Sequence, residues 1–328
     1  MQLAIDKAWK YQLLTYPNPA VGATVTCKEI LLSVEAHKKA GTAHAEVLAL
    51  KSAYLTKYPN SELKELETSQ EIHDFLIKNH NNFFHDCEIY VTLEPCNHIG
   101  KTPACAILLE VVKPKKVYIG TLDPNNEASG GLQRLQNANI DVEINISKKE
   151  TDDLLYPFIQ WQKDKFVFFK IAMREDGSID GGYITTQDSL NFVHELRTKI
   201  DLMVIGGNTV RIDRPTLDSR YSESKIAPNI LIYSRQKEFD KNIKLFTIKN
   251  RNVEISDNFE LQNSKNFVMI EGGYKLLESI KQNIDYLVIF MSHKKNYSQK
   301  KDMNICGFEI KYSYYINEND EIFFLARK

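Results

Sequence analysis

The chain has 328 residues, of which 43% are hydrophobic and 26% charged, and a formal net charge of −1 at pH 7. At roughly 150 residues per domain, this length predicts two domains that each bury a core. A net charge this close to zero argues against a polynucleotide-binding protein. The sequence has no run of about 18 apolar residues, so we expect no membrane span. The early charge at Asp6 does not fit a secretory leader, so we expect a cytoplasmic protein with reduced cysteines.

Helices and strands alternate in the first half of the chain. The first predicted helix runs from Leu3 to Leu14 and ends before Pro17 and Pro19. The elements predicted after it are strands Val21–Cys27 and Ile30–Val34, helix His44–Leu55, strand Glu88–Leu93, helix Ala104–Val112, strand Val117–Gly120, helix Leu132–Ala138 and strand Ile140–Ile144. This order predicts a layered α/β domain over residues 1–147.

A polar insertion at about residues 56–86 interrupts the alternation, and we expect it to be helical and peripheral. Its three histidines, His73, His80 and His85, have no cysteine or acidic partners at ligand spacing. We therefore interpret them as solvated side chains rather than as metal ligands.

The second half predicts a separate α/β domain over residues 165–328, joined to the first by a charged linker helix at 148–164. The strands predicted in it are Phe166–Ala172, Leu202–Ile205, Ile230–Tyr233, Phe267–Ile270, Leu287–Met291 and Phe308–Tyr312, with helices at Ser189–Lys199 and Tyr274–Gln282. No internal repeat relates the two halves.

The residues that carry the most chemistry are His44, Glu46, Cys96 and Cys105. One imidazole and two thiolates hold zinc and leave its fourth position open, as catalytic zinc requires. H-x-E followed by P-C and a later Cys is typical of zinc deaminases, in which the glutamate moves protons and is not a ligand. His44 and Glu46 are two residues apart, and such side chains can face one cavity only at the first residues of a helix, so we expect a helix to begin there. We expect a second helix to begin at Cys96, after Pro95. The competing interpretation is a closed structural zinc site or unrelated cysteines.

The stretch from Thr92 to Cys105, TLEPCNHIGKTPAC, is more specific than this general pattern. Together with Asn18–Gly22, His44–Glu46 and Asp123–Asn125, it resembles the bifunctional riboflavin-biosynthesis deaminase-reductases. Eight residues separate Cys96 from Cys105, as in that family. The resemblance implies a cytidine-deaminase-like domain followed by a dihydrofolate-reductase-like domain, with one Zn²⁺ in the first and NADPH in the second.

The resemblance also implies roles for individual residues of the first domain. His44, Cys96 and Cys105 correspond to the zinc ligands and Glu46 to the proton carrier. Asn18, His37 and Asp123 lie where the family lines its deaminase pocket. Taken alone, Asn18 between two prolines is more typical of a turn.

The signals in the second domain are weaker, because no G-x-G-x-x-G fingerprint is present. Glycines follow two predicted strands, at Gly206–Gly207 and at Gly272–Gly273, and Ser234–Arg235 follows a third, where a hydroxyl and a guanidinium could hold a 2′-phosphate. The resemblance places Ala172, Tyr183, Thr209, Asp213, Ser234 and Gly273 near NADPH. It places Arg197, Leu217, Arg220 and Glu271 near the phosphorylated pyrimidine substrate.

The segment from Ser178 to Gln187 is about five residues shorter than in the family, and this leaves a second interpretation open. In that alternative the chain is only a deaminase, and the impaired second domain binds a ligand or supports dimerisation. A third interpretation, a zinc-stabilised protein that binds or edits nucleic acid, is disfavoured because there is no basic stripe. We expect a small-molecule enzyme without a nucleic-acid or membrane partner, and the resemblance implies a homodimer.

Overall fold

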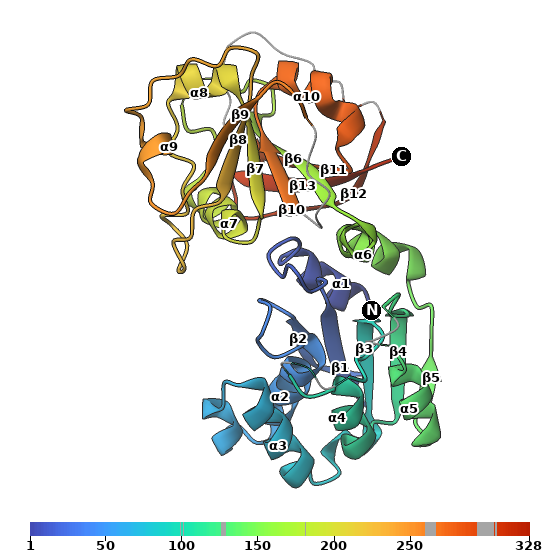
Figure 1. Ribbon diagram of the computed structural model, residues 1–328. Helices are drawn as coiled ribbons and strands as arrows, with labels where there is room; N and C mark the ends of the chain where they lie inside the picture. The colour runs from blue at the N-terminus through green and yellow to red at the C-terminus, as the bar shows by residue number, and fades with distance from the viewer. Residues whose placement is uncertain are drawn as a thin grey trace. The chain divides into compact units, whose positions relative to one another are not determined.

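The computed structural model describes residues 1–98, 100, 102–125, 129–180, 182–259, 267–293, 305 and 307–328. Ile99 and Lys101 of the deaminase motif, and Gly181 of the short segment, lie outside the described residues. The chain divides into two compact units, Met1–Ile159 and Gln160–Lys328. The division falls inside helix α6 (Lys148–Lys163), which has the bounds of the charged helix predicted from the sequence (Figure 1).

The first unit contains a five-stranded sheet in the order β2-β1-β3-β4-β5. Its strands are β1 (Gly22–Cys27), β2 (Ile30–Ala36), β3 (Cys87–Leu93), β4 (Lys116–Thr121) and β5 (Asp141–Glu143). Strand β1 pairs antiparallel with β2 and β3, whereas β3, β4 and β5 run parallel. The parallel arrangement brings the carboxyl ends of β3 and β4 to the same edge, and both strands lead into loops of the candidate site.

Helices cover both faces of this sheet, and the alternation of side chains along the strands decides which residues face which helix. On one face, Gly22 and Gly120 are in close contact with α1 (Gln2–Trp9) and α6, through Ala4 and Thr151. On the other face, Ala23, Val25, Ile89 and Val91 belong to a core shared with helices α2, α3 and α4. The helices of that face are α2 (Ala45–Lys57), α3 (Ser69–Asn79), α4 (Cys105–Val112) and α5 (Gly131–Asn137), with short 3₁₀ turns η1 (Glu62–Glu65) and η2 (Phe83–Asp86).

Two expectations for this unit were wrong in part. The first helix ends at Trp9, and turns occupy the residues up to Pro17. The insertion at 56–86 is helical, but it is not merely solvated, because Ile72 and Leu76 on α3 are fully buried in the core. His73 is only 4% exposed, and its Nε2 lies 3.2 Å from the carbonyl oxygen of Ala104, so it supports the loop before α4.

The second unit contains an eight-stranded sheet in the order β12-β13-β11-β6-β10-β7-β8-β9. The strands are β6 (Phe166–Arg174), β7 (Leu202–Gly206), β8 (Asn229–Tyr233), β9 (Val253–Ser256), β10 (Phe267–Glu271), β11 (Tyr286–Ser292), β12 (Phe308–Tyr315) and β13 (Asp320–Arg327). The helices are α7 (Gln187–Arg197), α8 (Gly207–Asp213), α9 (Lys244–Thr247) and α10 (Tyr274–Ile280), with a 3₁₀ turn η3 (Lys281–Asn283). The sequence analysis missed β9, β13 and α9.

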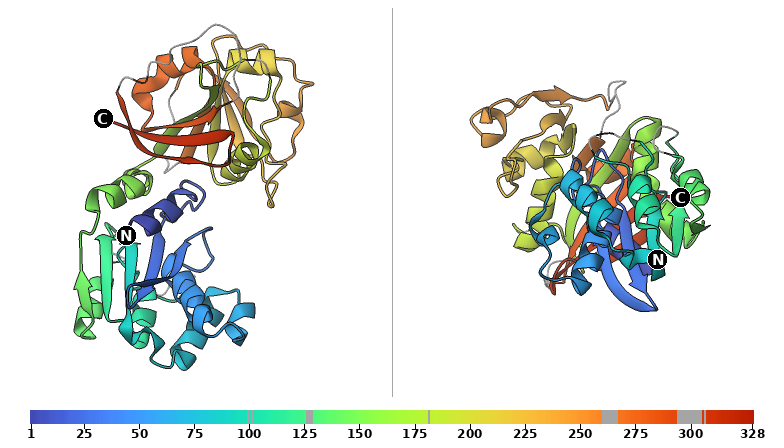
Figure 2. Two further views of the ribbon diagram at one scale, coloured as in Figure 1. Left: turned by 180° about the vertical axis from the view of Figure 1, so that it is seen from behind. Right: turned by 90° about the horizontal axis from the view of Figure 1, so that it is seen from below.

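Six strands of this sheet, from β11 to β9 in sheet order, run parallel, and only β12 and β13 are antiparallel to their neighbours. Parallel strands are buried on both faces and carry long apolar runs, as Phe166–Phe169 does at the start of β6. Figure 2 shows helices on both sides of this sheet. Lys170 is the charged exception in the middle of β6, and it marks the candidate reductase site.

Within the described part of the chain, no helix is both long enough and apolar enough to cross a membrane.

Gly22 provides a test of how α1 packs on β1. A Cβ atom added at Gly22 lies 1.9 Å from the carbonyl oxygen of Ala4, and backbone cannot move away as a flexible side chain can. We expect Gly22→Ala to lower the free energy of unfolding of the first unit by about 1–3 kcal/mol, the usual cost of overpacking. The measurement is urea unfolding followed by the fluorescence of Trp9, which is 1% exposed on α1, in a Trp161→Phe background. An unchanged midpoint would show that α1 is not held against β1.

Candidate functional site

Three predicted ligand side chains converge in the first unit, although the first and the last are 61 positions apart in the sequence. His44 is the N-cap of α2 in an extended conformation (φ −72°, ψ 164°), Cys96 lies in the loop after β3, and Cys105 is the first residue of α4. One ligand atom from each lies within 4.8 Å of the others. Among the described residues, these three side chains lie close enough together to hold a metal ion.

The geometry prepares Cys96 to act as an anionic ligand. Its Sγ accepts a hydrogen bond from the backbone N–H of Cys105 at 3.4 Å and lies 3.6 Å from Nδ1 of His44. Hydrogen bonding from Cys105 and the nearby His44 lower the pKa of the Cys96 thiol to about 4, despite its burial. The expectation that Cys96 begins a helix was wrong, because Cys96 lies in a loop. The amide that reaches its sulfur belongs to the start of α4 instead.

The other ring nitrogen of His44 faces Thr102, which the sequence analysis did not single out. The distance from Nε2 of His44 to Oγ1 of Thr102 is 3.3 Å, while Nδ1 lies 3.4 Å from Sγ of Cys105. When Nδ1 is the ligand atom, Nε2 carries the proton and donates to the hydroxyl. A partner such as Thr102 fixes the orientation of the His44 imidazole. The sequence offered one signal for Thr102, its position inside the TLEPCNHIGKTPAC stretch.

Glu46, two residues after His44, is 4% exposed on the first turn of α2 and lies beside Cys105. Burial, with the negative charge of Cys96, raises its pKa to about 7. A group with a pKa near neutrality can both take up and release a proton at working pH. Because His44 is the N-cap of α2, its side chain and that of Glu46 both reach Cys105 from the start of the helix.

Asn18 and His37 lie beside this cluster. The His37 and His44 rings meet edge to face, with centroids 5.3 Å apart. Nδ1 of His37 donates to the Ala43 carbonyl oxygen at 3.1 Å, so its Nε2 is the atom that accepts from the Asn18 amide, also at 3.1 Å. Burial, with the neighbouring His44, lowers the pKa of His37 to about 4, and His37 is therefore neutral at pH 7.

Glu94 connects the loop of Cys96 to the loop of Asp123, and the sequence analysis missed it. This carboxylate is 6% exposed and accepts hydrogen bonds from the backbone N–H groups of Asp123, Gly130 and Leu132, at 3.1, 3.0 and 2.9 Å. Burial raises the pKa of Asp123, to which the nearby Glu94 and Cys96 add. The structure thus brings Asp123 to the edge of the cluster through Glu94, two residues before Cys96.

In the second unit, a buried ion cluster lies at the carboxyl end of β10. Two predicted substrate residues contact each other there, because Nη2 of Arg197 donates to both carboxylate oxygens of Glu271, at 3.2 and 3.3 Å. Nζ of Lys170, which pairs in register with Glu271 across β6 and β10, lies 3.9 Å from Oε1. Burial alone would raise the pKa of Glu271, but Lys170 and Arg197 bring it below its usual value. Lys170 was missed, although a lysine inside an apolar strand was the available signal.

The other predicted substrate residues lie on the segment after α8. Nη1 of Arg197 donates to the Asp218 carbonyl oxygen at 3.0 Å, and Leu217, at φ 54° and 6% exposed, is held through its carbonyl by Arg251. Arg220 is exposed and donates to the Asp218 carboxylate at 2.8 Å. Arg220 thus presents a guanidinium to solvent, whereas Arg197 is engaged with Glu271.

Two of the six residues predicted near NADPH, Ser234 and Gly273, lie in turns that directly follow strands. Ser234 follows β8, and a Cβ added at Gly207 lies 2.5 Å from the Ser234 side chain, so α8 and the end of β8 are in direct contact. Gly273 is the N-cap of α10, and Tyr183 is 79% exposed. The carboxyl ends of parallel strands are the usual ligand-binding edge of such sheets. Of the others, Ala172 is on β6, opposite Phe290, and Thr209 and Asp213 are on α8.

Family models match both halves of the chain. The cytidine and deoxycytidylate deaminase zinc-binding region matches residues 1–121, and the RibD C-terminal domain matches residues 165–291. The deaminase match contains the three converging ligands and Glu46. These matches confirm the expected fold class, a cytidine-deaminase-like domain followed by a reductase domain.

Similar proteins and structures carry the same pair of domains. The riboflavin biosynthesis protein RibD of Aquifex aeolicus is 28% identical over 90% of this chain and 86% of its own length. That of Haemophilus influenzae is 32% identical over 68% of this chain, an alignment that spans 55% of the Haemophilus protein. A diaminohydroxyphosphoribosylaminopyrimidine deaminase/5-amino-6-(5-phosphoribosylamino)uracil reductase from Thermotoga maritima superposes with a TM-score of 0.64, at 25% identity, over 100% of this chain and 97% of that one. The chain belongs to the RibD family of riboflavin biosynthesis proteins.

Proposed function

We propose that the chain catalyses two consecutive steps of riboflavin biosynthesis. The first unit deaminates 2,5-diamino-6-ribosylamino-4(3H)-pyrimidinone 5′-phosphate, and the second reduces the ribosyl group of the product with NADPH to give 5-amino-6-ribitylaminouracil 5′-phosphate. The observation that carries the proposal is the convergence of His44, Cys96 and Cys105 within 4.8 Å beside the buried Glu46, in a chain that also has the RibD reductase domain.

The donor set of the first unit fits zinc. Two sulfurs and one imidazole are the ligands that zinc prefers, and three protein ligands leave a position open. In that place zinc supplies Lewis acidity, which lowers the pKa of water to about 7. Glu46 is placed to take the proton of the attacking water and to deliver protons to a ring nitrogen and to the departing ammonia. Asn18, fixed by neutral His37, keeps its carbonyl oxygen for an amine of the substrate.

In the second unit, NADPH supplies the hydride, and the residues of the chain bind and orient the sugar phosphate. Glu271 is kept ionised by Arg197 and Lys170, so it can accept hydrogen bonds from ribosyl hydroxyls. Arg220 is exposed and pairs with Asp218 through Nε, so its Nη groups are the ones that would bind the phosphate. The homodimer stays a prediction from the resemblance, and the cytoplasmic location stays a prediction from the early charge at Asp6 and the cysteines.

The proposal is tested by incubating the pure protein with the diaminopyrimidine phosphate, with and without NADPH, and by following product masses. We expect loss of ammonia in both reactions and a further gain of two hydrogens only with NADPH. Ammonia loss with no gain of hydrogen under any condition would favour the alternative, a deaminase with an impaired second domain. Binding of tRNA at physiological salt would favour an editing protein.

Glu46→Gln separates proton transfer from metal binding. We expect the deamination rate to fall by about 10²–10⁴-fold, because general acid–base help has that value, while zinc stays bound. The measurements are the rate of ammonia release and the zinc content per chain. Glu35→Gln, on β2 and bonded to Ser52, is the control, and reduction of supplied deaminated substrate should persist in both variants. A metal-free Glu46→Gln protein would contradict the assigned role.

Glu94→Gln tests whether the loop contacts position Cys96. A glutamine places an NH₂ group against at least one of the three backbone N–H donors, so the loop has to shift. We expect zinc affinity to fall by about 10–100-fold, as for other groups that orient metal ligands, measured by competition with a chromophoric chelator. Glu88→Gln, on the strand that precedes Glu94 and paired with Lys115 and Tyr90 among the described residues, should bind zinc normally. Equal zinc affinities in Glu94→Gln and Glu88→Gln would contradict a role for Glu94 in positioning Cys96.

Lys170→Met tests the ion cluster. Removing one of the two cations beside Glu271 shifts the carboxylate, and misplacement of that kind can reduce a rate by about 10²-fold. We expect kcat/KM of the reduction to fall while the deamination rate is unchanged. The matched control is Lys199→Met, because Lys199 is similarly buried but pairs with Glu195 on α7. A normal reductase rate in Lys170→Met would contradict a role for Lys170.

A further inference from the structure

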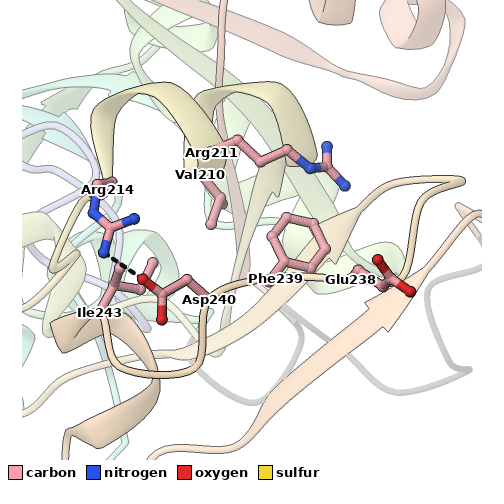
Figure 3. A pocket seen from close by; sticks show the side chains of 7 residues that line it. All are labelled: Val210, Arg211, Arg214, Glu238, Phe239, Asp240 and Ile243. Carbon is pink, nitrogen blue, oxygen red and sulfur yellow. Dashed lines mark hydrogen bonds and ion pairs between the residues drawn. The ribbon is translucent and has the colours of Figure 1, made fainter.

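A cavity of about 440 Å³ in the second unit lies between α8 and the segment that follows β8 (Figure 3). Its apolar wall is formed by Val210, Phe239 and Ile243, and its charged lining includes Arg211 and Arg214. The cavity adjoins Ser234, since Nη2 of Arg211 donates to the Ser234 hydroxyl oxygen at 3.2 Å. It therefore lies next to one of the residues predicted to approach NADPH.

Arg211 is held in one orientation but keeps its charge. Besides Ser234, its Nη2 donates to the carbonyl oxygen of Gln236 at 3.1 Å, and its guanidinium carbon lies 4.3 Å from the centroid of the Phe239 ring. Both acceptors are neutral oxygens, and no carboxylate in the described part of the chain forms an ion pair with Arg211. Glu238 also lines the cavity but does not pair with it. The guanidinium thus has donors left for an anion.

The second arginine of the cavity differs in this respect. Nη2 of Arg214 donates to a carboxylate oxygen of Asp240 at 2.5 Å, as the dashed line in Figure 3 shows, so its charge is already compensated. Of the two arginines, Arg211 is thus the one without a carboxylate partner among the described residues, and it lies beside an apolar, partly aromatic wall in a cavity that Glu238 also lines. This combination suits a flat base attached to a sugar that carries one phosphate monoester.

We propose that Arg211 selects NADPH over NADH by binding the 2′-phosphate of its adenosine, with the adenine in the cavity against Val210 and Phe239. The inference rests on the proposed reductase function and deepens it. The sequence had pointed to Arg235 as the guanidinium beside Ser234. The structure gives that contact to Arg211, one helical turn from the Gly206–Gly207 pair, and leaves Arg235 exposed.

The experiment measures binding and not turnover. Wild type, Arg211→Ala, Arg211→Lys and Arg235→Ala are titrated by calorimetry with adenosine 2′,5′-bisphosphate, adenosine 5′-monophosphate, NADPH and NADH. We expect Arg211→Ala to weaken the two ligands that carry a 2′-phosphate by about 10–100-fold, the range of a charged hydrogen bond, and the other two by less than about threefold. Arg211→Lys, which keeps the charge, should lose less.

Two controls show that the unit stays folded and that the effect is local. Lys241→Ala removes a nearby cation that stacks on Phe246 and lies outside the cavity, and it should bind all four ligands normally. Phe239→Leu removes the ring that faces both the adenine and the Arg211 guanidinium, and it should weaken both NADPH and NADH. Deamination by the first unit should be normal in every variant.

The outcomes separate the inference from the function on which it rests. If wild type binds NADPH and Arg211→Ala binds it as tightly, or loses NADPH and NADH to the same extent, the role of Arg211 is refuted and the reductase stands. A selective loss in Arg235→Ala with a normal Arg211→Ala would assign the phosphate to Arg235 instead. If wild type binds neither NADPH nor the bisphosphate, the proposed reductase falls, and this inference falls with it.

Discussion

A carboxylate that is taken out of water has to be satisfied by cations or hydrogen-bond donors, and this requirement organises the sites in both units. In the first unit, Glu94 is 6% exposed and is satisfied by three backbone N–H groups, which ties the loops around Cys96 and Asp123 together. In the second, Glu271 is satisfied by Arg197 and Lys170, which joins α7 to the centre of the sheet. Around each carboxylate, segments distant in sequence are therefore fixed relative to one another.

Much of the first unit could be predicted from its sequence, because the decisive signals are local. Runs of strand-forming residues predicted the ends of β1, β2 and β3 to within two residues, and the H-x-E pattern required His44 to stand at the start of a helix, which it does. The grouping of His44 with Cys96 and Cys105 came from their chemistry, and the structure places their ligand atoms together. Local pattern and ligand chemistry were sufficient there.

What the sequence did not reveal depends on contacts between distant segments. Pro95 looked like a helix start, but the helix begins only at Cys105, because residues 94–97 are occupied with tying loops together. Strand β9 has only four residues, Val253–Ser256, and both β9 and β13 are defined by their pairing with β8 and β11 in the sheet. For the same reason Arg197, expected at a phosphate, is found on Glu271, and no local signal distinguished Arg211 from Arg235.

The division of the chain into two units has a genetic consequence. The core around β1 to β4 and the core around β6 to β11 share no residue, and the boundary between the units runs through a single helix, α6. An allele damaged in one site therefore still encodes an intact fold for the other. We expect two such alleles with lesions in opposite halves to complement each other in one cell when the deaminated intermediate diffuses between separate protein molecules.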